Sequence, residues 1–337
     1  MILVTGGTGL VGSHLLYQLV SNNETVRAIY RQKEKLDIVK EVFSYYSENT
    51  ETLFNRIEWV AADITEVTSL IPLFKDITHV YHCAALVSFA PNKYHQLRKV
   101  NIEGTANVVN LCIANGVKKL CYVSSIATIG SEPKNTDLIT ERTHWNPEDD
   151  NNVYAITKYG AEIEVWRGTQ EGLNAVIVNP GIIIGPGFWN GDGSGSIFKK
   201  IHKGLPFYTH GITGYVGVWD VVNAMHTLMK SGIVNDNYIL VSENLSFNEF
   251  QIKVANCLSV SPAKKEASTF ILEMAWRLDW LQHTLLRTPR RFTKQMARSA
   301  RTETRYSTDK ITSALDFKFS DIETDIARTS KFYRLHL

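Results

Sequence analysis

The chain has few cysteines, and their arrangement argues against a metal site. The four cysteines stand at positions 83, 112, 121 and 257, with no CxxC pair and no cluster of histidine and cysteine at metal-ligand spacing. We therefore expect buried, free thiols in a reducing compartment and no bound metal. An excess of one charge is missing too, since 36 basic and 34 acidic side chains nearly cancel. This balance gives no general attraction to nucleic acid.

Long apolar runs are also missing. The most apolar late stretch, residues 270–286, carries Glu273, Arg277 and Asp279, which excludes a membrane span. The chain begins in the strand-like MILVTGG, without the basic and apolar regions of a secretion signal. These absences predict a soluble cytoplasmic protein with no integral membrane segment.

Short apolar runs alternate with longer helical patterns through the first half of the chain. We predict strands at residues 1–5, 25–30, 57–61, 79–82, 120–123 and 175–179. Helical patterns occupy residues 10–20, 34–46, 67–74, 94–115 and 153–170. This order predicts an α/β protein of the Rossmann type, with a doubly wound parallel sheet and helices on both faces.

The pattern loosens after residue 179 into the glycine-rich GPGFWNGDGSGS, residues 185–196. We expect a dinucleotide-binding domain over residues 1–182. A helix at 220–230 and a strand at 238–242 should return to it within residues 215–242. Residues 183–214 and 243–337 would then form a smaller, discontinuous C-terminal lobe that binds the substrate.

A glycine-rich turn follows the first predicted strand. In TGGTGLVG, the residues Gly6, Gly9 and Gly12 have the spacing GxxGxxG. Glycine permits a tight turn and a close approach to a pyrophosphate, which the free N–H groups of the following helix attract. Between a strand and a helix this pattern indicates dinucleotide binding; a purely structural turn is the alternative. The other candidate cofactor contacts in the turn are Thr8, Leu10 and Val11.

Two tyrosine–lysine pairs have the spacing of a catalytic pair. Tyr154 and Lys158 lie on one face of a predicted helix, but about one such pair is expected by chance, and Tyr306 with Lys310 is a second. Context favours the first pair, because Ser125 ends a predicted strand about thirty residues upstream, at the edge where such sheets bind ligands.

The chemistry of this set is acid–base catalysis. A phenol has a pKa near 10, which a neighbouring Lys158 ammonium and a positive nicotinamide ring would lower. Tyr154 could then exchange a proton with a carbonyl or alcohol oxygen held by Ser125. Ser124 is the competing serine. Asn101 either orders a water molecule or braces the strand beneath the site.

The TGxxGxxG turn and the Tyr154/Lys158 pair together resemble the extended short-chain dehydrogenase/reductase family. Further matching pieces occur in order, over residues 61–65 (AADIT), 82–85 (HCAA), 101–105 (NIEGT), 122–130 (YVSSIATIG), 179–187 (NPGIIIGPG) and 218–221 (VWDV). The resemblance runs from residue 1 to about residue 242 and implies a homodimer formed through the helix that carries the pair. The cofactor contacts that it implies are Asp63 and Ile64 at the adenine, Ala84 and Ala85 along the cofactor, Lys158 at the ribose, and Pro180, Ile182 and Ile183 near the nicotinamide.

The end of the second predicted strand indicates which nicotinamide cofactor binds. An acidic residue there selects NAD, but TVRAIYRQKEK has Tyr30 at or next to that position and no carboxylate before Glu34. Arg31 can pair with a 2′-phosphate, as in the dihydroflavonol reductase branch that VRAxxR resembles. We therefore expect NADP rather than NAD, with a solvated basic edge as the alternative.

Three functions remain open. The first is a reductase or dehydrogenase for a ketone, aldehyde or secondary alcohol, similar to dihydroflavonol reductases. The second is a nucleotide-sugar epimerase that retains NAD, and the third is a nucleotide-sensing protein without catalysis. Sensors of this fold commonly lack the Tyr/Lys pair, and the missing acidic residue argues against the epimerase. The candidate pocket walls, which could equally be core, are Val87, Ser88, Phe89, Ile183, Phe188 and Trp189.

A basic segment follows an apolar helix late in the chain. Seven basic residues between 287 and 305 face a single acid, Glu303. We interpret the segment as a solvated basic face. The alternatives are binding of an acidic substrate and association of an amphipathic helix with anionic lipid.

Overall fold

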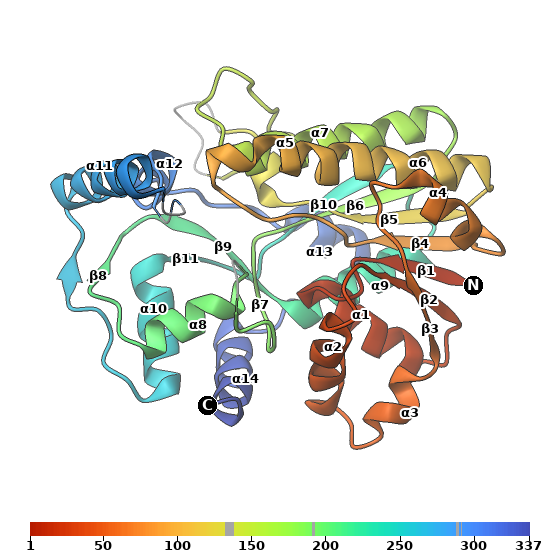
Figure 1. Cartoon of the computed structure of the whole chain (residues 1–337), viewed down its shortest axis with the longest axis horizontal. Coiled ribbons are helices and arrows are strands. Elements are labelled where there is room, and N and C mark those ends of the chain that lie inside the picture. The colour runs from red at the N-terminus through yellow and green to blue at the C-terminus, as the bar shows by residue number, and fades with distance from the viewer. Residues whose placement is uncertain (132–137, 191–192, 288–289, 291) are drawn as a thin grey trace.

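A seven-stranded parallel sheet forms the centre of the molecule (Figure 1). The structure, a computed structural model, describes residues 1–131, 138–190, 193–287, 290 and 292–337. The strand order is β3-β2-β1-β4-β5-β6-β10. These strands are β1 (Ile2–Thr5), β2 (Val26–Tyr30), β3 (Ile57–Ala61), β4 (His79–His82), β5 (Lys119–Val123), β6 (Ala175–Pro180) and β10 (Asp236–Leu240). The predicted strands are confirmed, although the last begins two residues earlier than its pattern indicated.

Helices cover both faces of this sheet, and each face has its own apolar core (Figure 1). On one face lie α1 (Leu10–Ser21), α2 (Lys35–Ser44), α3 (Thr50–Phe54) and α9 (Val218–Lys230). On the other face lie α4 (Val67–Leu70), α5 (Tyr94–Leu97), α6 (Gly104–Ala114) and α7 (Val153–Gln170). Neighbouring strand residues point to opposite cores, as Leu3 and Val4 do. The predicted Rossmann-type fold is confirmed.

Two helical predictions need correction. α3 was not predicted, because five residues are too short to show a helical period. The single helix predicted over 94–115 is interrupted by a π-helical turn, Arg98–Glu103, between α5 and α6. Such turns insert one residue and are frequent at functional sites, and this one contains Asn101.

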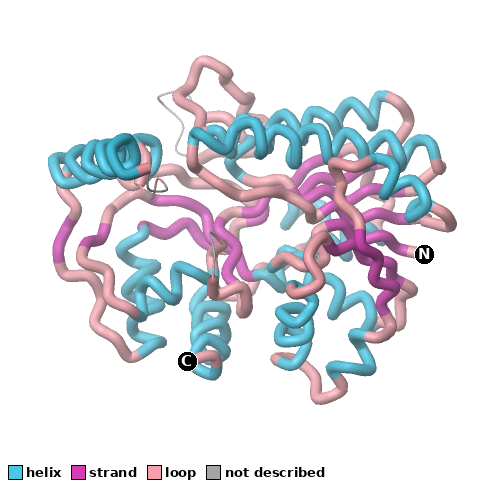
Figure 2. Tube along the Cα trace, in the orientation of Figure 1, coloured by secondary structure: helices cyan, strands magenta, loops and turns pink. Residues whose placement is uncertain are grey.

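A second, three-stranded sheet follows the main one. Its order is β11-β9-β7, and Figure 2 shows these strands apart from the main group. The strands are β7 (Ile182–Ile184), β9 (Ile212–Gly217) and β11 (Glu243–Ser246). The helices beside them are α8 (Gly195–His202), α10 (Phe247–Leu258) and α14 (Ile322–Leu335). Only Gly181 separates β6 from β7, so the division of the chain at residue 182 stays a prediction.

The third apolar core lies between this sheet and its helices. Tyr215 stacks on Phe250 at 4.5 Å between ring centroids, and Trp189 packs edge-on against Tyr333. Trp189 is only 2% exposed, so it belongs to this core rather than to a pocket wall. Gly191 and Asp192 of the predicted glycine-rich loop lie outside the described residues.

The remaining elements extend the second lobe. They are β8 (Phe207–Tyr208), β12 (Lys265–Glu266), α11 (Thr269–Leu286), α12 (Lys294–Ser299) and α13 (Asp309–Leu315). All four cysteines are free. Within the described ranges, no three metal-ligating side chains come together, and no helix has both the length and the apolarity to cross a membrane.

Two buried carboxylates meet where α14 packs near the start of α9. Asp220 accepts hydrogen bonds from the backbone N–H and the hydroxyl of Ser320, both at 3.0 Å. Oδ2 of Asp325 is buried and has no hydrogen-bond partner among the described residues. Burial, and then repulsion from Asp220, raises the pKa of Asp325 to about 6, although Arg328 opposes this shift.

We expect Asp325→Asn to raise the unfolding temperature above pH about 6 and to change it little below about pH 4. Because the pKa of folded Asp325 exceeds the ordinary value of 3.8, the folded chain binds the proton more tightly, and wild-type stability falls as the pH rises between these values. The amide cannot ionise and escapes this loss. Thermal unfolding across the range measures the difference, and a gain that does not depend on pH would contradict this account.

Candidate active site

The glycine-rich turn lies where the strand order reverses, between β1 and its neighbours β2 and β4. Gly6 has φ +69°, and a Cβ there would lie 2.5 Å from the backbone nitrogen of Ala84. A Cβ on Gly12 would lie 2.2 Å from the carbonyl oxygen of Gly6. Packing within the protein therefore requires glycine at both positions. Ligands of such folds bind at this reversal of strand order.

Gly9 has a different reason to be glycine. It is the N-cap of α1 with extended backbone (φ −109°, ψ 175°), and a Cβ there would meet no protein atom closer than 3.4 Å. The protein itself therefore tolerates a side chain at this position. What glycine leaves open is space beside the first N–H groups of α1, which suits a phosphate.

The residues next to the turn differ in their solvent exposure. Thr8 and Leu10 are half-buried, Val11 is buried, and Ala85 is exposed beyond the end of β4. Ile64 is 4% exposed and lies in the apolar core against Gly104, so its side chain faces away from solvent. Of the residues expected near the nicotinamide, Pro180 ends β6, while Ile182 and Ile183 begin β7 half-buried.

The two residues predicted at the adenosine end lie together. The Arg31 guanidinium is 3.6 Å from the Asp63 carboxylate, and both side chains are partly exposed. Burial tends to raise the pKa of Asp63, but hydrogen bonds from Thr65 and the charge of Arg31 bring it below the ordinary value. At the adenosine end, the Asp63 carboxylate therefore orients the Arg31 guanidinium.

The two candidate serines at the end of β5 have different partners. The Ser124 hydroxyl is buried and donates to Oε2 of Glu162 at 2.5 Å. Ser125 is half-buried, and its Oγ accepts a 3.2 Å bond from the backbone N–H of Ala127 in the same turn. The Ser124 hydroxyl is therefore occupied by its bond to Glu162, and Ser125 is the serine available to a ligand.

Tyr154 stands in the first turn of α7. The helix begins where predicted, since the Asn152 side chain accepts a 2.8 Å bond from the Ala155 N–H. The Phe89 ring packs edge-on against the Tyr154 ring, with centroids 5.5 Å apart. Burial raises the pKa of the Tyr154 phenol, while a hydrogen bond with Ser125 opposes the rise. Ser125, Tyr154 and Phe89 therefore share one site.

Lys158 is more deeply buried than expected, at 1% exposed. Its Nζ donates to the Tyr122 hydroxyl at 2.6 Å and to the Val123 carbonyl at 2.8 Å. Burial lowers the pKa of Lys158 to about 7, and the charge of Glu162 resists this fall. The expected lowering of the Tyr154 pKa is not seen, because the weakly basic amine lies beneath the site on Tyr122.

Glu162 is the residue that the sequence argument missed. Its Oε2 accepts hydrogen bonds from Ser124, from the Thr128 hydroxyl at 2.7 Å and from Asn179 Nδ2 at 2.9 Å. The side chain is 6% exposed and lies one helical turn beyond Lys158. That four-residue spacing was the available signal, because it places a carboxylate on the same helix face as the lysine.

Asn101 braces the chain beneath the site. Its amide oxygen accepts from the Leu86 N–H at 2.8 Å, and its amide nitrogen donates to the Leu86 carbonyl and to the Thr157 hydroxyl. Three bonds to protein groups use most of the hydrogen-bonding capacity of this amide. Of the two roles considered, the structure therefore supports bracing.

The second Tyr/Lys pair has structural partners. Tyr306 forms an isolated bridge with Ile139, which is more sheet contact than we expected. Lys310 donates to Asp236 at 2.5 Å and to the Asn237 carbonyl at 2.9 Å, which ties α13 to β10. The lysine is therefore bonded to β10 and stabilises the edge of the sheet.

Two cavities accompany these elements. One, of about 500 Å³, lies beside the site and is lined by Ile126, Asn152, Ala155 and Tyr306 among others. The other, of about 630 Å³, lies at the amino ends of β1 and β4, around Ile2 and His79. Parallel sheets of this type bind ligands at the carboxyl edge, so only the first cavity adjoins the candidate chemistry.

Known proteins resemble this chain over most of its length. A putative dihydroflavonol 4-reductase of Synechocystis is 27% identical and covers 99% of this chain and 94% of its own. Sterol demethylase protein B of Methylococcus capsulatus is 26% identical over 73% of this chain and 71% of its own. A UDP-glucose 4-epimerase of Vibrio cholerae is 29% identical over 72% and 70%.

Solved structures share the fold. The crystal structure of gox2253 superposes with a TM-score of 0.82 at 23% identity, covering 100% of this chain and 98% of its own. The UDP-glucose 4-epimerase of Thermotoga maritima, solved with UDP-glucose, gives 0.76 at 20% identity and covers 99% of both chains. The model of the NAD dependent epimerase/dehydratase family matches residues 2–240. The chain therefore belongs to this family, within the extended short-chain dehydrogenases/reductases, and is an NAD(P)-dependent enzyme.

Proposed function

We propose that the enzyme is an NADP-dependent reductase of an apolar ketone or aldehyde. The observation that carries this proposal is the position of Tyr154. Its phenol interacts with the Ser125 side chain and its ring lies against Phe89, at the carboxyl edge of the sheet that also carries the glycine-rich turn. A proton donor, an oxygen-holding hydroxyl and an apolar wall thus meet at one place.

The chain's own groups supply the proton chemistry. When bound, the nicotinamide supplies a hydride to the carbonyl carbon. Tyr154 donates its phenolic proton to the carbonyl oxygen, which Ser125 holds by a hydrogen bond. Lys158 lies beneath the site with its Nζ on the Tyr122 hydroxyl, and we retain its expected contact with the ribose of the cofactor as a proposal. Run in reverse, Tyr154 accepts the proton of a secondary alcohol.

The candidate binding residues fit a dinucleotide. Gly6 and Gly12 allow the close packing of the turn, Gly9 leaves space for a pyrophosphate at the N-terminus of α1, and Asp63 lies just after β3, next to Arg31. We retain the cofactor contacts expected at Thr8, Ala84, Pro180 and Ile182 as proposals. Ile64 can contribute only its backbone, since its side chain is in the core.

Two observations support an apolar carbonyl compound as the substrate. The side chains of Phe89 and Val87, beside the site, are 40% and 41% exposed. The relatives include proteins named cinnamoyl-CoA reductase, tetraketide alpha-pyrone reductase and 3beta-hydroxysteroid dehydrogenase/decarboxylase. A panel of aromatic and steroid ketones and aldehydes, followed by NADPH consumption, tests this assignment. Turnover confined to sugar nucleotides would contradict it.

We expect Arg31→Ala to weaken NADP binding by roughly tenfold to a hundredfold and to leave NAD binding within about twofold. A guanidinium pairs with the 2′-phosphate, which NAD lacks, through a charge-assisted bond of about 1.5–3 kcal/mol. Equilibrium titration of both cofactors, followed by fluorescence, measures the effect. Arg27→Ala is the matched control, because Arg27 lies on β2, four residues before Arg31, but pairs with Glu58. Equal losses for NADP and NAD would contradict the assignment.

The alternative is a nucleotide-sugar epimerase, which the relatives named UDP-glucose 4-epimerase favour. Such an enzyme oxidises and then reduces the same substrate, so it retains its cofactor. Denaturation of freshly purified protein distinguishes the two proposals. Release of one NAD per chain would support the epimerase, whereas cofactor-free protein that takes up NADPH would support the reductase.

We also propose a homodimer formed through α7. Ile156 and Ile163 are 38% and 44% exposed and stand seven residues apart, on one face of this helix. An apolar pair of this kind suits helix–helix packing between copies. The cytoplasmic compartment stays an expectation from the sequence.

A further inference from the structure

Helix α11 carries an exposed apolar stripe. Every large side chain on one face of the helix is apolar and 41–73% exposed. The five residues follow the helical period and are Phe270, Met274, Leu278, Leu281 and Leu285. Phe270 and Leu285, at the two ends, are 73% and 70% exposed. We call these five residues the α11 stripe.

The opposite face of α11 anchors the helix to the protein. Leu272 and Trp276 pack with Ala297 of α12 and with Phe292 in a small separate core. Only Leu272 of the helix is fully buried. The helix is therefore held in place from behind while the α11 stripe points away from the described part of the chain.

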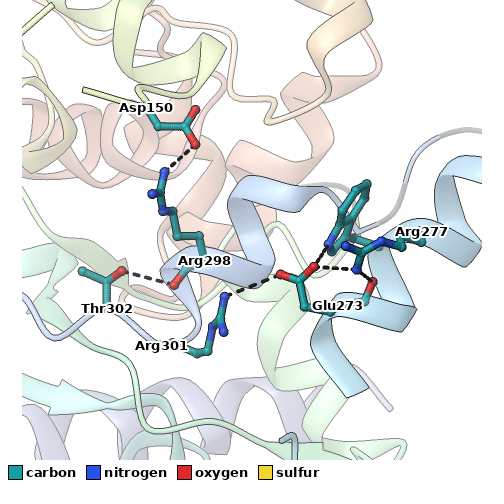
Figure 3. A network of polar contacts seen from close by, with 7 residues as sticks. Asp150, Glu273, Arg277, Arg298, Arg301 and Thr302 are labelled. Atoms are coloured by element: carbon teal, nitrogen blue, oxygen red, sulfur yellow. Dashed lines mark hydrogen bonds and ion pairs between the residues drawn. The ribbon is translucent and has the colours of Figure 1, made fainter. Parts of the chain in front are cut away.

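The acidic residues of α11 are neutralised behind the α11 stripe. Glu273 accepts from Arg277 at 2.5 Å and from Trp276 at 3.0 Å, and Arg301 of the following segment lies 3.7 Å away (Figure 3). Asp279 pairs with Arg290 at 2.7 Å. Both carboxylates of the helix are thus paired with arginines, so neither would repel an anionic surface in contact with the α11 stripe.

The same network refines our interpretation of the basic segment. Arg290, Arg298, Arg301 and Arg305 all form ion pairs, and Arg298, Arg301 and Arg305 keep side chains that are 39–63% exposed. Arg291 lies outside the described residues. Basic side chains that form no ion pair with a described residue remain at both ends of α11. They are Lys264 and Lys265 before the helix, and Arg287 and Lys294 after it, and all four are exposed.

We propose that α11 docks this enzyme on an anionic lipid bilayer, with the α11 stripe in the interface and the flanking basic side chains on the head groups. An amphipathic helix with an apolar face and basic flanks binds such a surface in its plane. The helix cannot cross the bilayer, because its apolarity is too low and it carries Glu273 and Asp279.

Charge favours a bilayer over a second copy of the chain as the partner. Both ends of α11 are basic, so two copies packed through the α11 stripe would bring like charges together in either orientation. An anionic leaflet attracts the same groups. The stripe is also separate from Ile156 and Ile163 of α7, the face that we propose for the dimer.

Docking would take place beside the catalytic helix. Arg298 of α12 donates to Asp150 at 2.5 Å (Figure 3). Gln295 donates to the Asn151 carbonyl at 3.2 Å. Asn151 immediately precedes Asn152, the N-cap of the helix that carries Tyr154. Two direct contacts thus join α12, on which α11 packs, to the residues that precede the catalytic helix.

Vesicle flotation of the full-length protein tests the proposal. We expect binding to vesicles of phosphatidylcholine mixed with phosphatidylglycerol, and weaker binding to pure phosphatidylcholine or at high salt. The double variant Leu278→Glu, Leu281→Glu should lose at least about tenfold in vesicle affinity. Lys264→Gln and Lys265→Gln should each lose about fivefold. These positions are exposed, so the variants should fold, which circular dichroism checks.

The matched control is Ile71→Glu, which changes an apolar side chain that is 54% exposed, before β4. It should bind vesicles like the wild type. Wild-type protein that fails to float with anionic vesicles would overturn the proposal, as would equal flotation of the stripe variant. A dimer that the stripe variant converts to a monomer, without any vesicle binding, would assign the α11 stripe to a second copy instead.

Discussion

We expect Tyr154→Phe to lower kcat for carbonyl reduction by about a thousandfold while NADP affinity stays within about twofold, as for loss of a general acid. The change removes only the hydroxyl, which interacts with the Ser125 side chain. The ring remains against Phe89, so the apolar wall is kept. Stopped-flow measurement of NADPH oxidation, together with a separate cofactor titration, distinguishes lost chemistry from lost binding.

Tyr306→Phe is the matched control for this result. Tyr306 has the same four-residue spacing to a lysine, but its lysine, Lys310, pairs with Asp236. We expect kcat of this variant within about twofold of the wild type, because no proton transfer depends on a phenol in that place. A normal kcat in Tyr154→Phe would remove Tyr154 from the mechanism.

The second large effect is on stability. We expect Glu162→Gln to lower the free energy of unfolding by about 3 kcal/mol, in the range measured when one partner of a buried charge pair is removed. Oε2 of Glu162 accepts three hydrogen bonds, and its charge is the main attraction that keeps Lys158 protonated in a buried place. Without that charge, the pKa of Lys158 should fall further below about 7.

Urea unfolding monitored by tryptophan fluorescence measures this loss. Glu164→Gln is the control, since Glu164 lies on the same helix but pairs with Arg167 at the surface. An exposed pair of this kind contributes about 0.2–1 kcal/mol. If Glu162→Gln and Glu164→Gln were equally stable, the buried cluster would not have the role that we give it.

The main sheet could be predicted because its strands are local and simple. Each is a short run of apolar residues, followed by a helix with a clear period, and the turn at Gly6 has a spacing that few other structures need. The choice of Tyr154 over Tyr306 also followed from the order of elements. In both cases the information lies within a few tens of residues of sequence.

The second sheet and the support of the site could not be predicted, for physical reasons. β7 has three residues, and its partner β9 and the next strand of the sheet, β11, come from segments about thirty and sixty residues away, so no local period marks them. Glu162 looks like an ordinary polar residue of a surface helix until the strand ends that carry Ser124 and Asn179 meet it. Burial of Lys158 likewise depends on Tyr122, from a strand distant in sequence.

The central claim is that Tyr154 serves a reductase that exchanges NADP, and one measurement tests it most directly. Purified protein is mixed with NADPH and a panel of apolar carbonyl compounds, and the oxidation of the cofactor is followed over many turnovers. We predict that one or more compounds will give repeated oxidation of added NADPH, one molecule per alcohol formed, by wild-type protein but not by Tyr154→Phe. Tightly retained NAD that never exchanges with added cofactor, with a sugar nucleotide epimerised and no net oxidation, would contradict the claim.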